Sequence, residues 1–311
     1  AVSFRPNFYN MRTSTSLAIL LLGVFLSNCQ PAKKQDNQAK LVANANRDEF
    51  ATYWFQGEAE VNSYHLEQSR YGEQRTGEAV LVFVTEDLSK LKQVKLDDPE
   101  ADWKDKVPVL KLNHIRRFVT GIYDYSMMQS VFTPLNISEF PHTLKTTTTS
   151  QDWCGHTFTQ LNLDGGKYRL SQFSYFEKEG DVSEKLPAAM LEDELLNRLR
   201  INPGSIAEGE VKLIPSTFYS RLRHQKLEPR KARIQMKKEG DVNYLVVEYL
   251  NFERSLTIGF EAVFPHKILS WVEEDGKEIS SKGTLKRSLK TAYWKKNKSE
   301  FEFLRDSLSL N

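Results

Sequence analysis

Tight turn sequences recur along this chain between alternating apolar stretches, and they limit the folds that it can adopt. Residues 157–163 alternate in side-chain character and lead into Asp164-Gly165-Gly166, which is typical of a hairpin turn. A similar turn, Glu239-Gly240-Asp241, precedes residues 244–250, and Asp275-Gly276 follows residues 268–272. Hairpins join antiparallel neighbours, whereas parallel strands need long crossovers. The sequence therefore predicts a mainly β fold of antiparallel strands.

One segment has helical spacing instead. Ala188, Leu191, Leu195 and Leu199 recur every three or four residues, and Asn202-Pro203-Gly204 then ends the pattern. Glu194 and Arg198 are spaced for an ion pair on the exposed side of such a helix. We expect a strongly curved sheet, or a sandwich or half-barrel, with one covering helix at about 186–200. That helix would lie on the sheet or close its open side.

The N-terminal region has the features of a secretion signal. Arg12 supplies a positive charge, and residues 17–26 form an apolar run that is too short to span a bilayer. Leu26-Ser27-Asn28-Cys29 resembles the lipobox of bacterial lipoproteins, in which the cysteine is acylated and becomes the first mature residue. An ordinary secretory signal with a coincidental cysteine is the alternative. We expect lipidation at Cys29, which would hold the protein on a membrane.

These features predict four regions. Residues 1–28 are a signal peptide, of which 1–10 are an upstream extension, and residues 29–49 are a lipidated polar tether. Residues 50–295 are the antiparallel β domain, beginning where aromatic side chains first cluster. Residues 296–311 are a charged C-terminal tail, in which apolar residues at helical spacing indicate a short helix: Phe301, Leu304 and Leu308.

Charge and motifs exclude several classes of protein. The 43 basic and 41 acidic residues give a net charge of +2, without the basic excess typical of nucleic-acid binding. The sequence contains no His-Glu-x-x-His, Gly-x-Ser-x-Gly or Cys-x-x-Cys motif and no phosphate-binding glycine loop. We therefore expect no cofactor and no nucleic-acid partner.

The densest group of reactive side chains is Gln151-Asp152-Trp153-Cys154-Gly155-His156. In an extended strand Asp152, Cys154 and His156 would share one face. They could then be zinc ligands, with His114 or His142 as a fourth, or Cys154 and His156 could form a nucleophilic pair. The simpler interpretation is a buried, unreactive thiol beside a core tryptophan. We favour that interpretation and expect neither a metal nor catalysis here.

A second group is basic. We expect a stretch within residues 221–233 either to contact anionic lipid head groups or to guard a solvated edge strand. Its cationic residues, apart from His224, are Arg221, Arg223, Lys226, Arg230, Lys231 and Arg233.

Five segments together resemble an uncharacterised bacterial lipoprotein family whose members often carry the label septum formation inhibitor Maf. They are residues 53–60, 80–87, 107–113, 121–123 and 153–156. The resemblance covers about residues 50–295 and implies an envelope lipoprotein. It implies no catalytic residues, because the Ser-x-Ser-Pro-Arg-Arg motif of true Maf nucleotide pyrophosphatases is absent.

We therefore expect an envelope lipoprotein anchored through Cys29, most concretely in the outer membrane facing the periplasm. Its role would be non-enzymatic binding or structure, such as carrying a lipid or another apolar ligand in the concavity of the sheet. An accessory subunit of an outer-membrane assembly is one alternative. An enzyme or metalloprotein centred on Asp152, Cys154 and His156 is the other.

Overall fold

A computed structural model describes residues 47–98 and 104–310. They form one 15-stranded sheet that does not close into a barrel and is antiparallel except where β9 meets β10. The predicted mainly β, antiparallel fold is confirmed. The predicted signal peptide, Cys29 and residues 30–46 of the tether lie outside the described residues.

The sheet consists of two halves that meet where β1 pairs with β15. The first layer contains β1 (Ala59–Arg70), β2 (Glu73–Ser89), β3 (Lys106–Thr120), β4 (Tyr123–Pro134), β5 (Lys145–Asp152), β6 (Gly155–Asp164), β7 (Lys167–Ser174) and β8 (Val182–Pro187). The second layer contains β9 (Met190–Leu191), β10 (Gly209–Ile214), β11 (Arg230–Glu239), β12 (Val242–Tyr249), β13 (Arg254–Glu261), β14 (Ile268–Asp275) and β15 (Glu278–Thr291).

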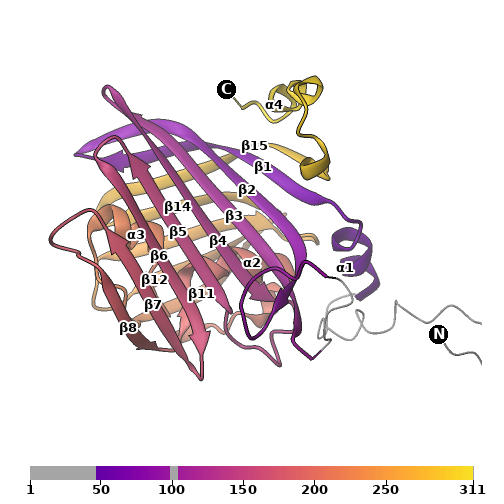
Figure 1. The fold of residues 1–311 in the computed structure, drawn as a ribbon, viewed down its shortest axis with the longest axis horizontal. Helices are drawn as coiled ribbons and strands as arrows, with labels where there is room; N and C mark the ends of the chain where they lie inside the picture. Colours follow the sequence, from indigo (N-terminus) through magenta and orange to yellow (C-terminus); the bar gives the residue numbers. More distant parts are fainter. Residues whose placement is uncertain (1–46, 99–103, 311) are drawn as a thin grey trace, which may run out of the picture. The chain divides into compact units, whose positions relative to one another are not determined.

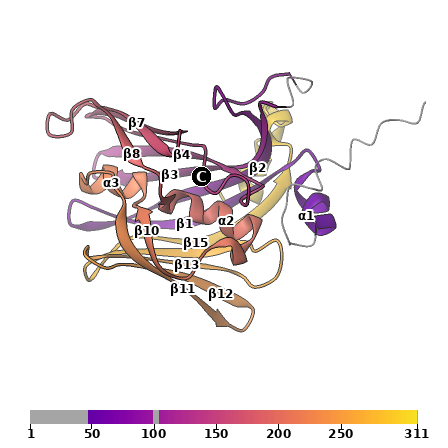
Figure 2. The same cartoon turned by 90° about the horizontal axis from the view of Figure 1, so that it is seen from below.

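Strong curvature brings the two layers face to face (Figures 1 and 2). His114 on β3 and Trp271 on β14 have ring centroids 5.2 Å apart, although β2, β1 and β15 separate their strands in the sheet. The main hydrophobic core lies between the layers and takes residues from both. The predicted curved sheet is therefore folded onto itself.

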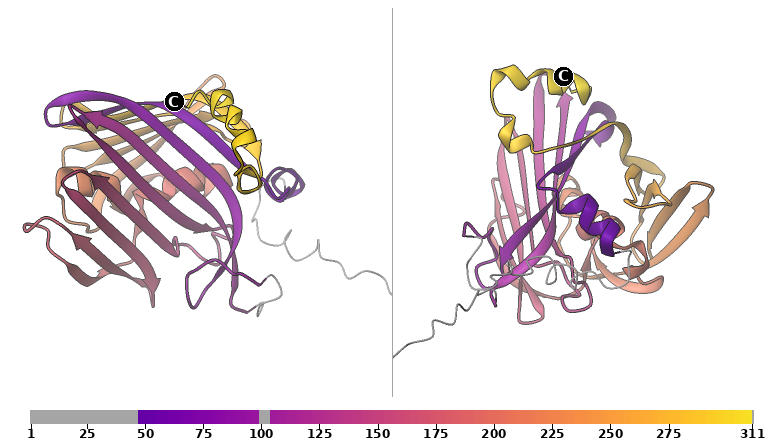
Figure 3. Two further views of the ribbon diagram at one scale, coloured as in Figure 1. Left: turned by 45° about the horizontal axis from the view of Figure 1, so that its top comes forward. Right: turned by 90° about the vertical axis from the view of Figure 1, so that its right-hand side faces the viewer.

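Alternating burial explains the continuous apolar run that marks β2. Leu81 and Phe83 face the main core, whereas Val82 and Val84 lie in a separate cluster on the other face. Leu308 of the C-terminal tail is buried in that second cluster. Because the tail covers this face, both sides of the strand are apolar. η4 (Tyr293–Lys295) leads into the tail, which contains η5 (Ser299–Phe301) and α4 (Phe303–Ser307), and Figure 3 shows the tail outside the sheet.

Helices close the open side between the two layers. The connection from β8 to β11 contains η2 (Glu192–Glu194), α2 (Leu195–Ile201), η3 (Pro203–Ser205) and α3 (Thr217–Arg223). Figure 2 shows α2 and α3 between the layers. A further helix, α1 (Arg47–Trp54), precedes β1, so residues 47–49 are helical and do not belong to the predicted tether. Phe50 and Trp54 anchor α1 in the main core.

The predicted helix at 186–200 is wrong in its extent. Leu186 lies in β8, and Leu191 of β9 pairs with Ile214 of β10, so the α-helix covers only residues 195–201. The helical spacing of these apolar residues is a coincidence, because they do not share one packed face. Leu186 and Leu191 pack in a different cluster from Leu195 and Leu199.

The predicted Glu194–Arg198 ion pair forms at 3.0 Å, but it is buried and not exposed. Glu194 also accepts the backbone N–H of Thr143, and Arg198 donates to the carbonyl of Pro141. Both side chains therefore attach α2 to the β4–β5 connection.

Candidate functional site

The Asp152–His156 segment is a hairpin and not one extended strand. β5 ends at Asp152, β6 begins at Gly155, and Trp153 and Cys154 form the turn. The chain reverses there, so Asp152, Cys154 and His156 do not line one strand face. Asp152 is buried and accepts the backbone N–H of Cys154 at 2.7 Å, while the side chains of Cys154 and His156 are exposed.

The prediction of a buried thiol beside a core tryptophan is also wrong. Trp153 is 69% exposed and Cys154 is exposed as well, because both occupy the turn. The pKa of the Cys154 thiol is nevertheless raised, by partial desolvation and by the negative charge of Asp152.

The two suggested additional ligands lie elsewhere. His114 is buried on β3 and accepts a hydrogen bond from Arg116 Nε at 3.1 Å. Burial and the Arg116 charge hold the pKa of His114 well below its usual value. His142 lies in the β4–β5 connection, at the other end of β5 from Asp152. Within residues 47–98 and 104–310, no three His, Cys, Asp or Glu side chains are grouped to bind a metal.

The basic stretch is divided between several elements. Arg221 and Arg223 belong to α3, whereas Arg230, Lys231 and Arg233 belong to β11. β11 lies between β10 and β12, so the interpretation as an edge strand is wrong. Three of these cations pair with separate carboxylates: Arg223 with Asp275, Arg230 with Glu228, and Arg233 with Glu210.

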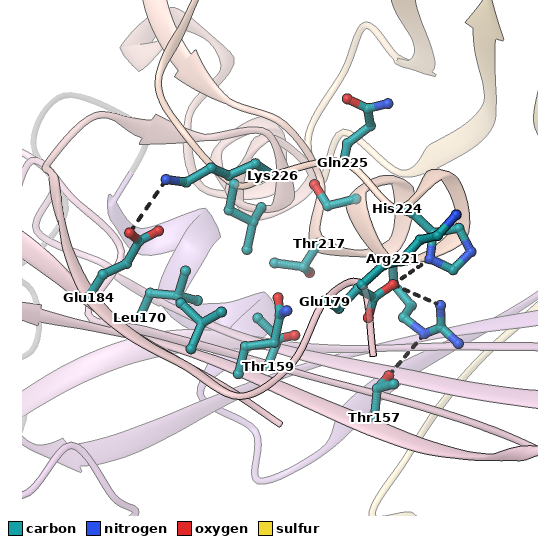
Figure 4. A pocket seen from close by; sticks show the side chains of 15 residues that line it. Thr157, Thr159, Leu170, Glu179, Glu184, Thr217, Arg221, His224, Gln225 and Lys226 are labelled. Carbon is teal, nitrogen blue, oxygen red and sulfur yellow. Dashed lines mark hydrogen bonds and ion pairs between the residues drawn. The ribbon is translucent and has the colours of Figure 1, made fainter. Parts of the chain in front are cut away.

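Arg221 and Lys226, which pair with Glu179 and Glu184, line a cleft of about 350 Å³ between β6–β8 and α3 (Figure 4). We call it the Arg221 cleft. Its wall combines hydroxyl, charged and apolar side chains: Thr157, Thr159, Leu170, Gln172, Lys178, Glu179, Val182, Glu184, Thr217, Ser220, Arg221, His224, Gln225, Lys226 and Leu227. A volume near 350 Å³ is within the range of small-molecule sites.

Arg221 is held in place without full hydrogen bonding. It is 7% exposed, and its Nε donates to Thr157 Oγ1 at 3.1 Å. Its Nη1 lies 3.5 Å from Glu179 Oε1, and it makes no hydrogen bond there or elsewhere. Phe176 packs 4.5 Å from the guanidinium carbon. Burial lowers the pKa of Arg221, and Glu179 opposes that effect.

Hydroxyl groups form the floor beside Arg221. Thr157, Thr159, Thr217 and Ser220 are all buried, and the Ser220 hydroxyl has no hydrogen-bond partner. Three residues that line the cleft therefore have a buried polar atom without a hydrogen-bond partner: a guanidinium nitrogen of Arg221, the hydroxyl of Ser220 and Oε1 of Glu184. Such groups are costly to bury unless a partner satisfies them.

The rim of the cleft carries two contacts between a nitrogen-bearing side chain and a glutamate. Lys226 lies 3.5 Å from Glu184, and His224 contacts Glu179. His224 ends α3 in the left-handed conformation, with φ of +53°, which directs the following residues along the cleft.

A buried ionic network, which the sequence did not predict, lies behind the cleft. Arg254 pairs with Glu192 and also with Glu273, at 2.9 Å, and Arg116 pairs with Glu273 at 2.7 Å. Burial acts to raise the pKa of Glu273, but Arg116 and Arg254 outweigh it and lower that pKa to about 2. The network links β3 with β13, β14 and η2 across the interior.

Asp193 connects this network to the cleft. Its carboxylate accepts the hydroxyl of Thr217 at 2.8 Å, and Thr217 is the first residue of α3. Burial raises the pKa of Asp193 to about 6, against hydrogen bonds from Ser216 and Thr217. The only sequence signal for these groups was the run Glu192-Asp193-Glu194 next to a helix, which is usually a solvated pattern.

Comparison with protein-family models, with curated proteins and with solved structures finds no match for this chain. No helix in the described part of the chain has the length and apolar character needed to cross a bilayer.

Proposed function

We propose that the protein is a lipid-anchored envelope protein that binds a small anionic ligand in the Arg221 cleft. The observation that carries the proposal is the buried Arg221 side chain, which lines the cleft, pairs with Glu179 at 3.5 Å and makes no hydrogen bond through Nη1. A phosphate or carboxylate group would complete its hydrogen bonding with a charge-assisted bond. The Ser220 hydroxyl would serve the same anion, and Lys226 could leave Glu184 to join it.

We propose binding and not catalysis because the cleft hydroxyl that donates to a carboxylate, that of Thr217 to Asp193, is buried and is also hydrogen-bonded to Gln129 and Thr148. The Ser220 hydroxyl has no hydrogen-bond partner, and Thr157 receives a hydrogen bond from Arg221. His224, the imidazole of the cleft, contacts Glu179 and not a hydroxyl. Activation of a hydroxyl nucleophile requires a base within hydrogen-bonding distance.

An anionic ligand also fits better than a wholly apolar one. The space between the layers is filled by the main core and by the ionic network, and the Arg221 cleft is lined largely by polar groups. Leu170, Val182 and Leu227 provide an apolar strip against which the uncharged part of a ligand could pack. A phosphate monoester with a short organic group satisfies both features.

Calorimetric titration with glycerol phosphate tests the binding site, with glycerol as the uncharged control. We expect the natural protein to bind glycerol phosphate and Arg221→Gln to bind it at least tenfold more weakly. Arg223→Gln is the matched control, because it removes a guanidinium from the same helix that pairs outside the cleft with Asp275. Equal affinity in Arg221→Gln, or no affinity in the natural protein for glycerol phosphate, inorganic phosphate or acetate, would reject the proposal.

Cell fractionation tests the anchor separately. We propose acylation of Cys29 in an outer membrane facing the periplasm, and Cys29→Ala should release the protein or leave it as an unprocessed precursor. A processed Cys29→Ala protein that stays in the membrane fraction would rule out the lipid anchor.

A further inference from the structure

Successive hairpins of the first layer carry large apolar side chains at their tips. The β1–β2, β3–β4, β5–β6 and β7–β8 turns fall at one end of the layer because these strands pair antiparallel in sequence order. Their exposed residues are Tyr71, Ile122, Trp153 and Tyr175, which are 58%, 81%, 69% and 67% exposed. We call these four residues and Tyr123 the tip row. α1 lies at the opposite end (Figure 1).

The tip row is a connected surface and not a scatter of single exposed residues. The Tyr71 hydroxyl is 2.8 Å from that of Tyr125, and the Tyr125 and Tyr123 ring centroids are 6.0 Å apart. Tyr123 and Trp153 follow at 6.4 Å. The Tyr175 ring packs so closely on Gly155 that an added Cβ there would lie 2.8 Å from it.

The requirements of a tight turn do not explain why large aromatic and aliphatic residues occupy these tips. Other hairpins of the sheet turn through small or polar residues, as at Gly165-Gly166 and Gly276-Lys277. Tyr71 has a φ of +56°, a conformation that glycine or asparagine adopts at lower cost. A bulky residue in such a conformation is an outlier that suggests a role outside folding.

The tip row reaches the mouth of the Arg221 cleft. Phe176 follows Tyr175 in the chain and packs against both Arg221 and His224, with its ring 5.7 Å from the imidazole. Lys178 and Lys226 lie at the same mouth, and both are exposed. An apolar, aromatic surface thus adjoins cationic groups that face an anion-sized cleft.

We propose that the tip row docks on a lipid bilayer and that the cleft takes the phosphate of a lipid head group from it. This inference rests on the proposed anion-binding function. Tyrosine and tryptophan favour the bilayer interface because one part of each ring system is apolar and another is polar. The apolar side chains on separate hairpin tips can each enter the bilayer interface. The neighbouring Arg221 cleft would then lie at the level of the lipid phosphates.

The anchor is long enough for this arrangement. The chain between Cys29 and Arg47 can span at most roughly 60 Å. β1, which runs from the α1 end to the tip row, has 12 residues and so extends about 40 Å. A protein acylated at Cys29 can therefore place its tip row on the bilayer that holds its acyl chains.

Cys154 offers a probe within the tip row, because it is exposed beside Trp153 and is the only other cysteine of the chain. The full-length acylated protein, labelled there with an environment-sensitive fluorophore, would be reconstituted in phosphatidylcholine vesicles with and without phosphatidic acid. The acyl chains hold every variant on the vesicle, so the emission reports whether the tips touch the bilayer. We expect a blue shift and quenching by head-group-level spin-labelled lipid, both stronger with phosphatidic acid.

Matched variants separate the contribution of the tip row to membrane contact from that of the Arg221 cleft. Tyr71→Ser/Ile122→Ser/Tyr175→Ser should abolish the shift while retaining affinity for glycerol phosphate. Leu91→Ser/Val263→Ser removes exposed apolar side chains outside the tip row and should behave like the natural protein. Arg221→Gln should keep the shift but lose its dependence on phosphatidic acid.

Other results would overturn the inference. An unshifted label in the natural protein rejects docking, while retained glycerol phosphate affinity would leave the proposed function standing. A shift that is equal for both lipids shows that the cleft does not bind the phosphate monoester of phosphatidic acid. Cross-linking from Cys154 to an envelope protein without lipid contact would assign the tip row to a protein partner.

Discussion

The guanidinium of Arg221 has partners for only part of its hydrogen-bonding capacity. Thr157 satisfies Nε, Phe176 packs against the guanidinium, and Glu179 pairs with Nη1 at 3.5 Å without a hydrogen bond. Arg200 shows the contrasting case, since both of its terminal nitrogens bind Glu60, at 2.5 and 2.7 Å. The protein completes the terminal nitrogens of Arg200, whereas Arg221 Nη1, like Arg223 Nη2 and Arg254 Nη1, makes no hydrogen bond; the position of Arg221 on the cleft distinguishes it.

Cys154 gives a prediction about reactivity. Its thiol is exposed, so iodoacetamide should label every folded molecule. The raised pKa leaves little thiolate at neutral pH, so labelling at pH 7 should be slower than for an unperturbed cysteine peptide and should accelerate as pH rises. Asp152→Asn removes the adjacent charge and should speed labelling at pH 7. Mass spectrometry of timed samples measures these rates.

Asp241→Asn, in the β11–β12 turn at the other end of the sheet, is the control and should leave the labelling rate unchanged. A Cys154 that resists labelling at every pH would mean that it is buried after all.

At the level of elements, the sequence located the turns much better than the helix. Asp164-Gly165-Gly166 and Glu239-Gly240-Asp241 join β6 to β7 and β11 to β12 as expected, because glycine at positive φ is a local requirement of the turn. The turn at Trp153-Cys154 was not predicted because neither residue is a glycine. The pairing of Leu191 with Ile214 depends on a distant strand, which local spacing cannot reveal.

The helix α2 gives a prediction about stability. Leu195 is fully buried in the main core, so Leu195→Ala should lower the free energy of unfolding by about 2–5 kcal/mol. Thermal melts followed by circular dichroism measure the loss. Leu91→Ala, at a position 85% exposed, should leave the midpoint unchanged. An unchanged midpoint in Leu195→Ala would mean that this face of α2 does not pack in the core.

In the whole molecule, buried ion pairs tie together parts of the chain that are distant in sequence. Arg200 on α2 pairs with Glu60 on β1, and Arg116 on β3 pairs with Glu273 on β14. Removing one partner of such a pair leaves an uncompensated charge and is strongly destabilising. Sequence reasoning could predict a curved sheet with a covering helix, but not this interior, because charged residues are usually solvated and their partners here are far apart in the chain.

The buried acids contribute to stability with opposite dependences on pH. Arg200 lowers the pKa of Glu60 to about 2 despite its burial, and Glu273 behaves likewise. Their contribution to stability is full above their unfolded-state pKa of about 4.5 and is lost as pH falls toward 2. Burial raises the pKa of Asp193 from 3.8 to about 6, so the folded state holds that proton more tightly. The contribution of Asp193 therefore declines as pH rises from about 4 to about 6.

We therefore predict that Asp193→Asn changes the pH dependence of stability in a defined window. Asparagine is neutral at every pH and imitates the protonated acid, so the variant should gain stability relative to the natural protein as pH rises from 4 to 7. The relative gain is on the order of 3 kcal/mol for a buried acid with this pKa. Denaturant titrations at pH 4 and pH 7 measure it, and Asp241→Asn, an exposed acid, should show no such difference. A gain that is equal at both pH values would mean that Asp193 is ionised throughout, and that α3 is held by a charge and not by a shared proton.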